Sequence, residues 1–313
     1  SLFFYYKTSG LFISILLFST MSDYIIGMLI HSSKKQLVKK IFLATSVIIN
    51  LFVLCYFKYA YFFTDAYNAF FQTDYQVFNH FAQFTNDTIG SHFDVDSILL
   101  PVGISFYTFQ TISYSVDIYR EQIKPVKSIL DFGFYVSFFP QLVAGPIVRA
   151  ADFIPQLYLP YQLTKYNFGL SLFWILKGLI KKVVIGDYIA INFIDRIFDA
   201  PTMYTGFENL MALYGYSLQV YADFSGYTDI AIGIALLMGF SLPTNFNSPY
   251  KAKNVGEFWK RWHISLSGWL RDYLYIPLGG NRGGSWGTWI SALFIGLFII
   301  LLSGKMLVLY IFI

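Results

Sequence analysis

The stretch 260–284, KRWHISLSGWLRDYLYIPLGGNRGG, brings together side chains that can do chemistry. His263 lies between Lys260 and Arg261 on one side and Arg271 on the other. Imidazole takes up and releases a proton near neutral pH, because its ordinary pKa is ~6.5. A positioned histidine can remove the proton of a hydroxyl that attacks an acyl group, which contributes about 10²–10⁴ in rate. The three basic side chains could hold the phosphates of an acyl carrier, as point charges or bidentate forks.

The helix that carries His263 is predicted from a capping signal and an apolar spacing. Asn254 followed by Glu257 has the form of a capping box, which predicts a helix start at about residue 255. One apolar face then recurs at three- and four-residue steps, through Trp259, Trp262, Leu266, Trp269 or Leu270, and Tyr273. We expect this Trp- and Arg-rich helix to lie in the cytoplasmic membrane interface, with His263 half shielded at the edge of its apolar face. A histidine so placed is more often a hydrogen-bonded structural residue than a catalyst, so both roles stay open.

The composition is that of a membrane protein. Of the 313 residues, 56% are hydrophobic and 13% are charged, whereas a soluble domain averages about 25% charged residues. The mean hydropathy is +0.53. The net charge of +4 is modest and no basic run has interleaved aromatic residues, so we expect no nucleic-acid partner. We predict membrane spans near residues 9–30, 41–63, 97–118, 130–148, 168–195, 208–222, 226–242 and 287–313.

The charges of the loops predict the orientation of these spans. Residues 32–40 carry four lysines, whereas residues 64–96 carry five aspartates and no Lys or Arg. By the positive-inside rule, the first segment faces the cytoplasm and the second faces outward. No linker or internal repeat divides the sequence, so we predict one membrane domain over residues 1–313.

Ionisable side chains within the apolar spans indicate a polar interior. A charge at membrane depth costs roughly 2.5–3.5 kcal/mol, so such groups should face a cavity, a partner or the interface. Asp223 and Asp229 are six residues apart and fall on roughly opposite helix faces, unless Gly226 breaks the helix; with such a break, Asp223 and Tyr221 could line a pocket. The lysines could instead extend to the headgroups. The residues concerned are Asp117, Lys177, Lys181, Lys182, Asp187, Asp223 and Asp229.

Proline and glycine inside two predicted spans indicate broken helices beside a polar cavity. Pro140 and Pro146 around Gly145 favour a re-entrant turn. We expect no metal, because the chain has a single cysteine and because His80 and His92, twelve residues apart, lack the spacing of metal ligands.

Four stretches carry a resemblance to a known family. The run NFNSPYKAKNVGEFWKRWHISLSGWLRDYLYIPLGGNRGG (245–284) closely resembles the signature of membrane-bound O-acyltransferases. The stretches 103–120, 138–149 and 221–240 are similar to the bacterial alginate-type acetyltransferase branch of that family.

The resemblance implies an all-α fold, a polytopic bundle of transmembrane helices with broken or re-entrant helices around a tunnel. It implies transfer of an acyl group, by default acetyl, to hydroxyls of an exported or cell-envelope polysaccharide. The donor would be acetyl-CoA or an acyl-carrier thioester, with no bound cofactor. Membrane lipid and an outer partner acetyltransferase are further expected partners, and the bacterial inner membrane is the expected location.

The site residues follow from the same resemblance. His263 matches the histidine of the RWHISLS motif, and we expect it to be catalytic. The residues that we expect to bind substrate or donor, or to line the tunnel, are Asp223, Tyr221, Gln110, Lys260, Arg261, Trp262, Arg271, Asn281 and Arg282.

The sequence departs from the family pattern at its end. A second histidine follows a Ser-Gly-Leu-Trp-His-Gly-like motif in the family, whereas this sequence reads KMLVLYIFI after Ser303 and Gly304. We therefore expect a chain that lacks the first span and the C-terminal catalytic helices, which leaves open an inactive fragment. Two other classes stay open: a transporter or pore, and a non-catalytic scaffold of a polysaccharide-modifying export complex.

Overall fold

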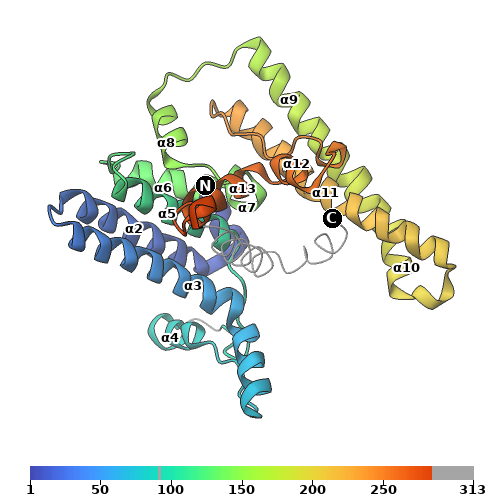
Figure 1. Cartoon of the computed structure of the whole chain (residues 1–313), viewed down its shortest axis with the longest axis horizontal. Helices are drawn as coiled ribbons and strands as arrows, with labels where there is room; N and C mark the ends of the chain where they lie inside the picture. Colours follow the sequence, from blue (N-terminus) through green and yellow to red (C-terminus); the bar gives the residue numbers. More distant parts are fainter. Residues whose placement is uncertain (91–92, 284–313) are drawn as a thin grey trace. The chain divides into compact units, whose positions relative to one another are not determined.

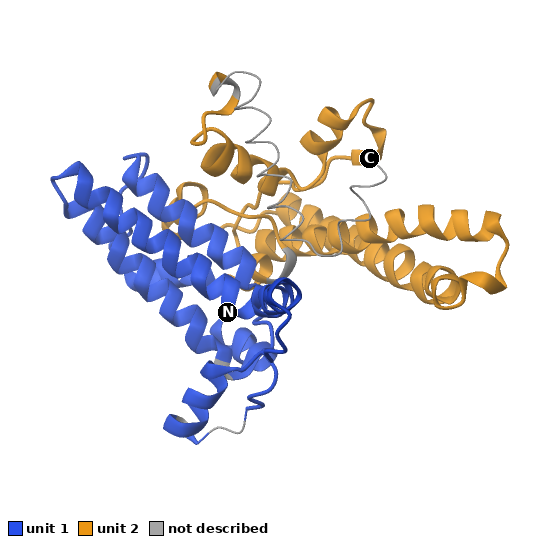
Figure 2. Cartoon of the chain, turned by 60° about the horizontal axis from the view of Figure 1, so that its bottom comes forward, with its two compact units in different colours: residues 1–137 blue, residues 138–313 orange. Residues whose placement is uncertain are grey.

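The computed structural model describes residues 1–90 and 93–283, in two compact units that meet in sequence at residues 137 and 138 (Figure 1; Figure 2). Within the described residues the secondary structure is helical and contains no strand, so the predicted all-α class is confirmed. The prediction of one membrane domain over residues 1–313 stays a prediction.

The first unit is built around long helices that pack on one another. Helix α2 contacts α3, α5 and α6, and α3 also contacts α5. The elements of this unit are α1 (Leu2–Ser9), η1 (Gly10–Phe12), α2 (Ile13–Ser32), α3 (Gln36–Phe71), α4 (His80–Ile89), α5 (Ile104–Tyr119) and α6 (Ile129–Ser137).

The second unit is built around α11, which contacts α7, α9 and the helical run that follows α9. Its first elements are α7 (Phe139–Ala144), α8 (Ala150–Phe153), η2 (Ile154–Tyr158), α9 (Lys165–Leu179), the π-helical η3 (Ile180–Tyr188) and η4 (Ala190–Ile194), α10 (Asp195–Asp199) and η5 (Pro201–Met203). Its later elements are α11 (Gly206–Leu237), η6 (Pro249–Lys251), α12 (Val255–Arg261), α13 (Ile264–Leu270), the π-helical η7 (Arg271–Tyr275) and η8 (Gly280–Gly283).

Three helices among the described residues are long and apolar enough to cross a membrane: α2, α3 and α11. The first two match the predicted spans 9–30 and 41–63. The predicted spans 208–222 and 226–242 are wrong as separate helices, because α11 runs through both. The predicted span 287–313 lies outside the described residues. The predicted interruption near Pro140 is observed, since α6 ends at Ser137 and the short α7 holds this proline in its first turn.

Gly226 does not break α11, which decides between the two alternatives that the sequence left open. A Cβ on Gly226 would lie 2.8 Å from the carbonyl oxygen of Gly178, and a Cβ on Gly178 would lie 2.6 Å from the carbonyl oxygen of Gly226. Two turns further along, a Cβ on Gly233 would lie 2.8 Å from the carbonyl oxygen of Ser171. The glycines therefore allow α9 and α11 to pack with their backbones in near contact, as small residues do between membrane helices.

A buried polar network joins α2, α3 and α5 in the first unit. The carboxylate of Asp23, which is 0% exposed, accepts hydrogen bonds from Ser46 Oγ at 2.5 Å and Asn50 Nδ2 at 2.7 Å. Asn50 Oδ1 in turn accepts from Thr111 Oγ1 at 2.9 Å and Ser19 Oγ at 3.1 Å. Polar side chains within an apolar bundle thus satisfy one another, as they must where no water is present.

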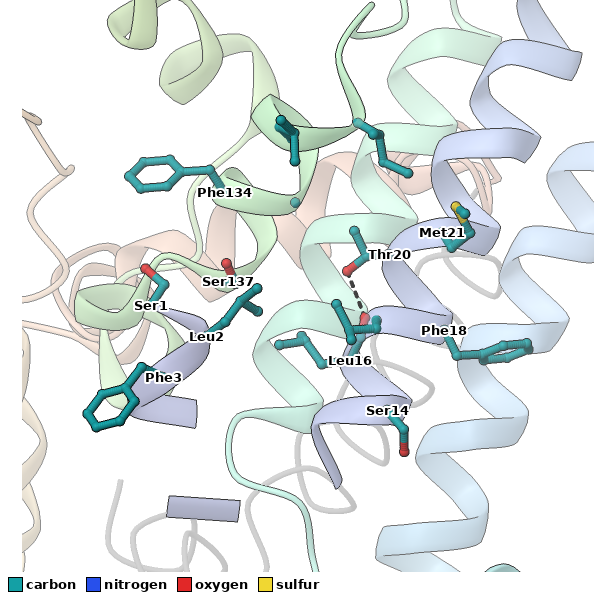
Figure 3. Close-up of a pocket in the computed structure, with 14 residues that line it drawn as sticks. Ser1, Leu2, Phe3, Ser14, Leu16, Phe18, Thr20, Met21, Phe134 and Ser137 are labelled. Atoms are coloured by element: carbon teal, nitrogen blue, oxygen red, sulfur yellow. Dashed lines mark hydrogen bonds between the residues drawn. The ribbon is translucent and has the colours of Figure 1, made fainter. Parts of the chain in front are cut away.

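An apolar groove of about 990 Å³ lies on the same unit, between α1, α2 and α6 (Figure 3). Leu16, Phe18 and Met21 of α2 line it together with Phe134 of α6. Thr20 Oγ1 donates to the carbonyl oxygen of Leu16 at 2.7 Å, so this hydroxyl is satisfied within its own helix.

Candidate functional site

The helix predicted to run through His263 is two short helices. Helix α12 begins at Val255, as predicted, and Asn254 Oδ1 accepts from the backbone N–H of Glu257 at 2.8 Å. The carboxylate of Glu257 accepts from the backbone N–H of Lys253 at 2.9 Å, so half of the predicted capping box is present. The chain then leaves the helix at Trp262, and α13 starts one residue after His263.

His263 itself adopts a left-handed backbone conformation, with φ 41° and ψ 56°. Residues other than glycine seldom adopt this backbone conformation, although histidine is among the residues enriched in it. Two backbone hydrogen bonds hold the break open: the N–H of Ile264 donates to the carbonyl oxygen of Asn245, and the N–H of Asn247 donates to that of Arg261, each at 2.9 Å. Pairing with residues 245–247 therefore interrupts the continuous helix that the apolar spacing of the sequence predicts.

The imidazole of His263 is enclosed, where we had expected it to be half shielded. It is 7% exposed, and its ring lies 4.8 Å from that of Phe224 in an edge-to-face contact and 6.3 Å from that of Phe246. Burial lowers the pKa of His263 from 6.5 to about 3, because an apolar cage disfavours the charged imidazolium. The side chain is therefore a neutral imidazole at physiological pH.

The polar contact of this imidazole is with Asn245. His263 Nδ1 lies 3.1 Å from Asn245 Oδ1, and the same oxygen accepts from the backbone N–H of Ser265 at 3.1 Å and from Ser265 Oγ at 2.9 Å. Ser265 Oγ also accepts from the backbone N–H of Ile147, at 3.0 Å, in the extended segment that follows α7. Asn245 and Ser265 were not singled out from sequence, because an isolated Asn or Ser gives no periodic or spacing signal.

Trp262 and Tyr221, both predicted site residues, lie in an aromatic cluster beside the histidine. Trp262 is fully buried and packs against Phe258 with ring centroids 5.5 Å apart. Tyr221 of α11 lies 6.1 Å from Trp262 and 5.4 Å from Tyr250, centroid to centroid. The cluster packs α11 against the segment that carries His263.

The predicted basic residues divide between paired and exposed positions. Arg261 uses Nε and Nη2 to bind Glu257 Oε1 at 3.0 and 2.7 Å, so its fork is already engaged within α12. Arg271 Nε binds Asp272 Oδ1 at 2.7 Å, while its side chain stays 65% exposed. Lys260 and Arg282 are exposed. Exposed cations of this kind are the ones that remain accessible to an anionic donor.

Arg149, which sequence analysis did not single out, reaches the same region. Its Nη2 binds Asp272 Oδ2, and its guanidinium lies 5.3 Å from the centroid of the Tyr273 ring. Although burial acts to raise it, hydrogen bonds from Arg271 and Arg149 hold the pKa of Asp272 below its ordinary value. Asp272 therefore remains a carboxylate that ties the segment after α7 to η7.

The lysines of α9 and η3 are paired with aspartates. Lys181 Nζ lies 2.7 Å from Asp229 Oδ2, and Lys177 Nζ lies 3.3 Å from the same oxygen. Asp229 is buried and α11 places it against the lysine-bearing run of η3 and α9. The charge at membrane depth thus has partners, which lowers its cost.

Asp223, a predicted tunnel residue, belongs to the same arrangement. Lys182 Nζ lies 2.5 Å from Asp223 Oδ1 and 2.6 Å from Asp187 Oδ1. Lys182 sits in the π-helical η3, a geometry that is frequent at functional sites. The pairing shows that Asp223 bridges α11 and η3, and its predicted role in lining a tunnel stays a prediction.

The predicted roles of two further site residues stay predictions. Gln110 is buried in α5 of the first unit. The side chain of Asn281 lies outside the described residues. Among the residues described, no group of three or more His, Cys, Asp or Glu side chains is placed to hold a metal ion.

Apolar helices long enough to cross a bilayer, and a buried imidazole that contacts an asparagine oxygen, are the features of a helical membrane protein with an enclosed histidine. The profile of MBOAT, the membrane-bound O-acyltransferase family, matches residues 11–300, and the chain belongs to this family. The resemblance read from the sequence motifs is thereby confirmed.

Three relatives are similar to this chain over 59–90% of its length. A "Peptidoglycan O-acetyltransferase" of Helicobacter pylori is 38% identical, over 90% of this chain and 55% of the relative. A "Probable alginate O-acetylase AlgI" of Azotobacter vinelandii is 42% identical, over 90% of this chain and 52% of the relative. A "Teichoic acid D-alanyltransferase" of Bacillus subtilis is 34% identical, over 59% of this chain and 47% of the relative. The chain spans about half the length of these relatives.

Proposed function

We propose that this chain belongs to an O-acyltransferase that moves an acyl group, by default acetyl, to hydroxyls of an exported or cell-envelope polysaccharide. The enclosed, neutral imidazole of His263 carries the proposal, because a general base must be unprotonated before it can accept a proton. The names of the relatives, two of which refer to O-acetyl transfer to peptidoglycan or alginate, support the substrate class.

The reaction replaces the thioester C–S bond with an ester C–O bond and moves the hydroxyl proton to the departing sulfur. The acceptor hydroxyl oxygen attacks the carbonyl carbon of the acyl thioester while His263 takes the hydroxyl proton. The tetrahedral intermediate then expels the thiolate, and the imidazolium returns the proton to that sulfur. Direct transfer needs no Ser or Cys nucleophile. Burial keeps the imidazole of His263 unprotonated before the attack, and because the same burial destabilises the imidazolium, it favours the second step, return of the proton to the thiolate.

The donor would be acetyl-CoA or an acyl-carrier thioester. Exposed Lys260, Arg271 and Arg282 support a donor with phosphates, because accessible cations can bind them directly. The bacterial inner membrane as the location, and a partner acetyltransferase on its outer side, complete the proposal. The apolar helices α2, α3 and α11 support insertion in a membrane.

The test compares His263→Gln with His31→Gln in membranes from cells that express the chain. Radiolabelled acetyl-CoA and an acetyl-carrier thioester are supplied in parallel, and label incorporated into polymer O-esters is measured. We expect incorporation in wild type, a loss of about 10²-fold or more in His263→Gln, and no loss in His31→Gln, because His31 is exposed. Equal incorporation in the two variants would contradict a catalytic His263, and polymer acetylation that persists in both would favour a scaffold.

A transport pathway is the second candidate, and the ion pair of Lys181 with Asp229 favours it, since paired charges within membrane helices are typical of substrate pathways. Asp229→Asn distinguishes the two functions. A transporter would lose movement of its solute across sealed vesicles, whereas a transferase, whose proposed base is His263, would keep O-acetylation.

A further inference from the structure

The orientation of the Asn245 amide can be assigned from its partners. The backbone N–H of Ser265 can only donate, so the atom that faces it, at 3.1 Å, must be the carbonyl oxygen of the Asn245 side chain. Ser265 Oγ accepts from the N–H of Ile147 and therefore directs its own proton to this oxygen, at 2.9 Å. Two independent donors thus fix which end of the amide faces His263.

The tautomer of His263 follows from that assignment. Because Asn245 Oδ1 can only accept, the ring nitrogen 3.1 Å away must carry the proton. A neutral imidazole has one N–H, so a proton on Nδ1 leaves Nε2 with a free lone pair. The other end of the asparagine does not compete, since Asn245 Nδ2 has no hydrogen-bond partner among the residues that the structure describes.

The backbone of the same residue holds the histidine in place. The carbonyl oxygen of Asn245 accepts from the N–H of Ile264, next to the left-handed His263. Asn245 is 1% exposed, so water does not replace these contacts. Asn245 therefore contacts both the backbone next to His263 and Nδ1, the ring nitrogen opposite Nε2.

We propose that Asn245 is a positioning residue that keeps His263 in the Nδ1–H tautomer and so makes Nε2 the atom that takes the acceptor's hydroxyl proton. The part of this inference that concerns Nε2 rests on the proposed transferase function. Ser265 supports the arrangement, because its hydroxyl links the Asn245 oxygen to the segment that contains Ile147.

The first experiment reads the tautomer without activity. The full chain is labelled with ring-¹⁵N histidine, purified in detergent, and the ¹⁵N shifts are measured at neutral pH, with the His263→Gln variant identifying the signals of His263. We expect a protonated Nδ1 and an unprotonated Nε2 in wild type, and a mixture of tautomers in Asn245→Leu, which has the same shape and no acceptor. A wild-type signal with the proton on Nε2, or an unchanged tautomer in Asn245→Leu, would overturn the inference.

A second variant tests the direction in which the pKa of His263 changes, and it keeps the inference testable if Asn245→Leu does not fold. Asn245→Asp keeps the acceptor oxygen and adds a negative charge beside Nδ1–H. We expect it to retain the Nδ1–H tautomer and to raise the pKa of His263, so that the acidic limb of the pH–rate profile moves to higher pH. Asn247→Asp, two residues away with an exposed side chain, is the matched control and should leave the profile in place. Equal shifts in the two aspartate variants would contradict a specific contact.

The same variants separate this inference from the proposed function. If the tautomer is Nδ1–H and depends on Asn245, while His263→Gln retains full transfer, the positioning stands and the catalytic role fails. If transfer requires His263 and Asn245→Leu changes neither the tautomer nor kcat, the catalytic role stands and the positioning fails. We expect both to hold, with kcat in Asn245→Leu reduced by about 10–100-fold and KM for the donor unchanged.

Discussion

Gly178 and Gly226 face each other where α9 and α11 cross. A Cβ on Gly178 would lie 2.6 Å from the carbonyl oxygen of Gly226, and a Cβ on Gly226 would lie 2.8 Å from that of Gly178. Atoms other than hydrogen-bonded pairs do not approach so closely, so an added methyl must push the helices apart. The crossing also sets the separation across which Lys181 reaches Asp229. The distance between the helices and the pairing of the charges therefore depend on each other.

We predict that Gly226→Ala destabilises the protein by about 1–2 kcal/mol. Alanine is normally favoured over glycine inside a helix by roughly 0.5–1 kcal/mol, but overpacking at the crossing costs about 1–3 kcal/mol. Thermal unfolding of the detergent-purified chain, followed by helical circular dichroism, measures the change. Gly169→Ala, in the partner helix α9, is the control and should be neutral or stabilising, because a Cβ on Gly169 meets nothing within 4 Å. Equal stability of the two variants would refute close packing at Gly226.

The role of Gly226 was left open by the sequence for an identifiable reason. A glycine within an apolar span permits either a helix break or a close helix contact, and the difference depends on the opposing helix. The partner, Gly178, is 48 positions away and carries no local signal. The start of α12 was predictable, by contrast, because Asn254 caps the residues that immediately follow it.

We predict that removing one partner of the Lys181 and Asp229 pair costs more than removing both. Asp229→Leu leaves two lysines without their shared carboxylate, and breaking a buried pair typically costs about 3–5 kcal/mol; the partial exposure of the lysines places the expected loss nearer 2–3 kcal/mol. Lys181→Met combined with Asp229→Leu should recover about 1 kcal/mol of that loss. Chemical unfolding of the two single variants and the double variant completes the cycle. Strict additivity would show that the two side chains do not interact.

We predict that Asp23→Leu destabilises the first unit by about 2–4 kcal/mol. The substitution leaves the Asn50 amide and the Ser46 hydroxyl buried without their acceptor, and each unsatisfied group costs about 1–3 kcal/mol. Asp65→Leu, at an exposed position of α3, is the control and should change stability by less than about 0.5 kcal/mol. Hydrogen exchange of α2, α3 and α5 localises the loss, and protection that falls equally throughout the chain would argue against a network confined to these helices.

Asp23 also shows why part of the interior was missed from sequence. It lies in a run of apolar residues that predicts a membrane span correctly, and nothing in that run indicates what the aspartate faces. Its partners come from α3 and α5, between 23 and 92 positions away. His263 is a similar case, because the apolar spacing from Trp262 to Trp269 continues through a break that pairing with the distant residues 245–247 explains. The all-α membrane class and the helix starts follow from composition and from neighbouring residues, whereas the contacts of Asp23 and His263 depend on residues far away in the sequence.

We predict that His263 makes the folded protein less stable as the pH falls below its ordinary pKa. Burial lowers the pKa of this imidazole from 6.5 to about 3, so between these values the unfolded chain binds a proton that the folded chain does not. Unfolding then takes up a proton, and the stabilising contribution is complete above pH 6.5 and is lost as the pH approaches 3, at up to about 1.4 kcal/mol per pH unit. His263→Gln removes this dependence while keeping a polar group beside Asn245.

The measurement is the free energy of unfolding of wild type and His263→Gln from pH 7 to pH 4.5, in one detergent at fixed ionic strength. Carboxylates with lowered pKa, such as Asp272, also lose stability on acidification, but they do so in both proteins and cancel in the difference. We expect the difference between wild type and variant to shrink as the pH falls, because only wild type must keep a histidine uncharged. A constant difference over this range would mean that His263 titrates near its ordinary pKa, and the neutral, caged base inferred from its burial would have to be given up.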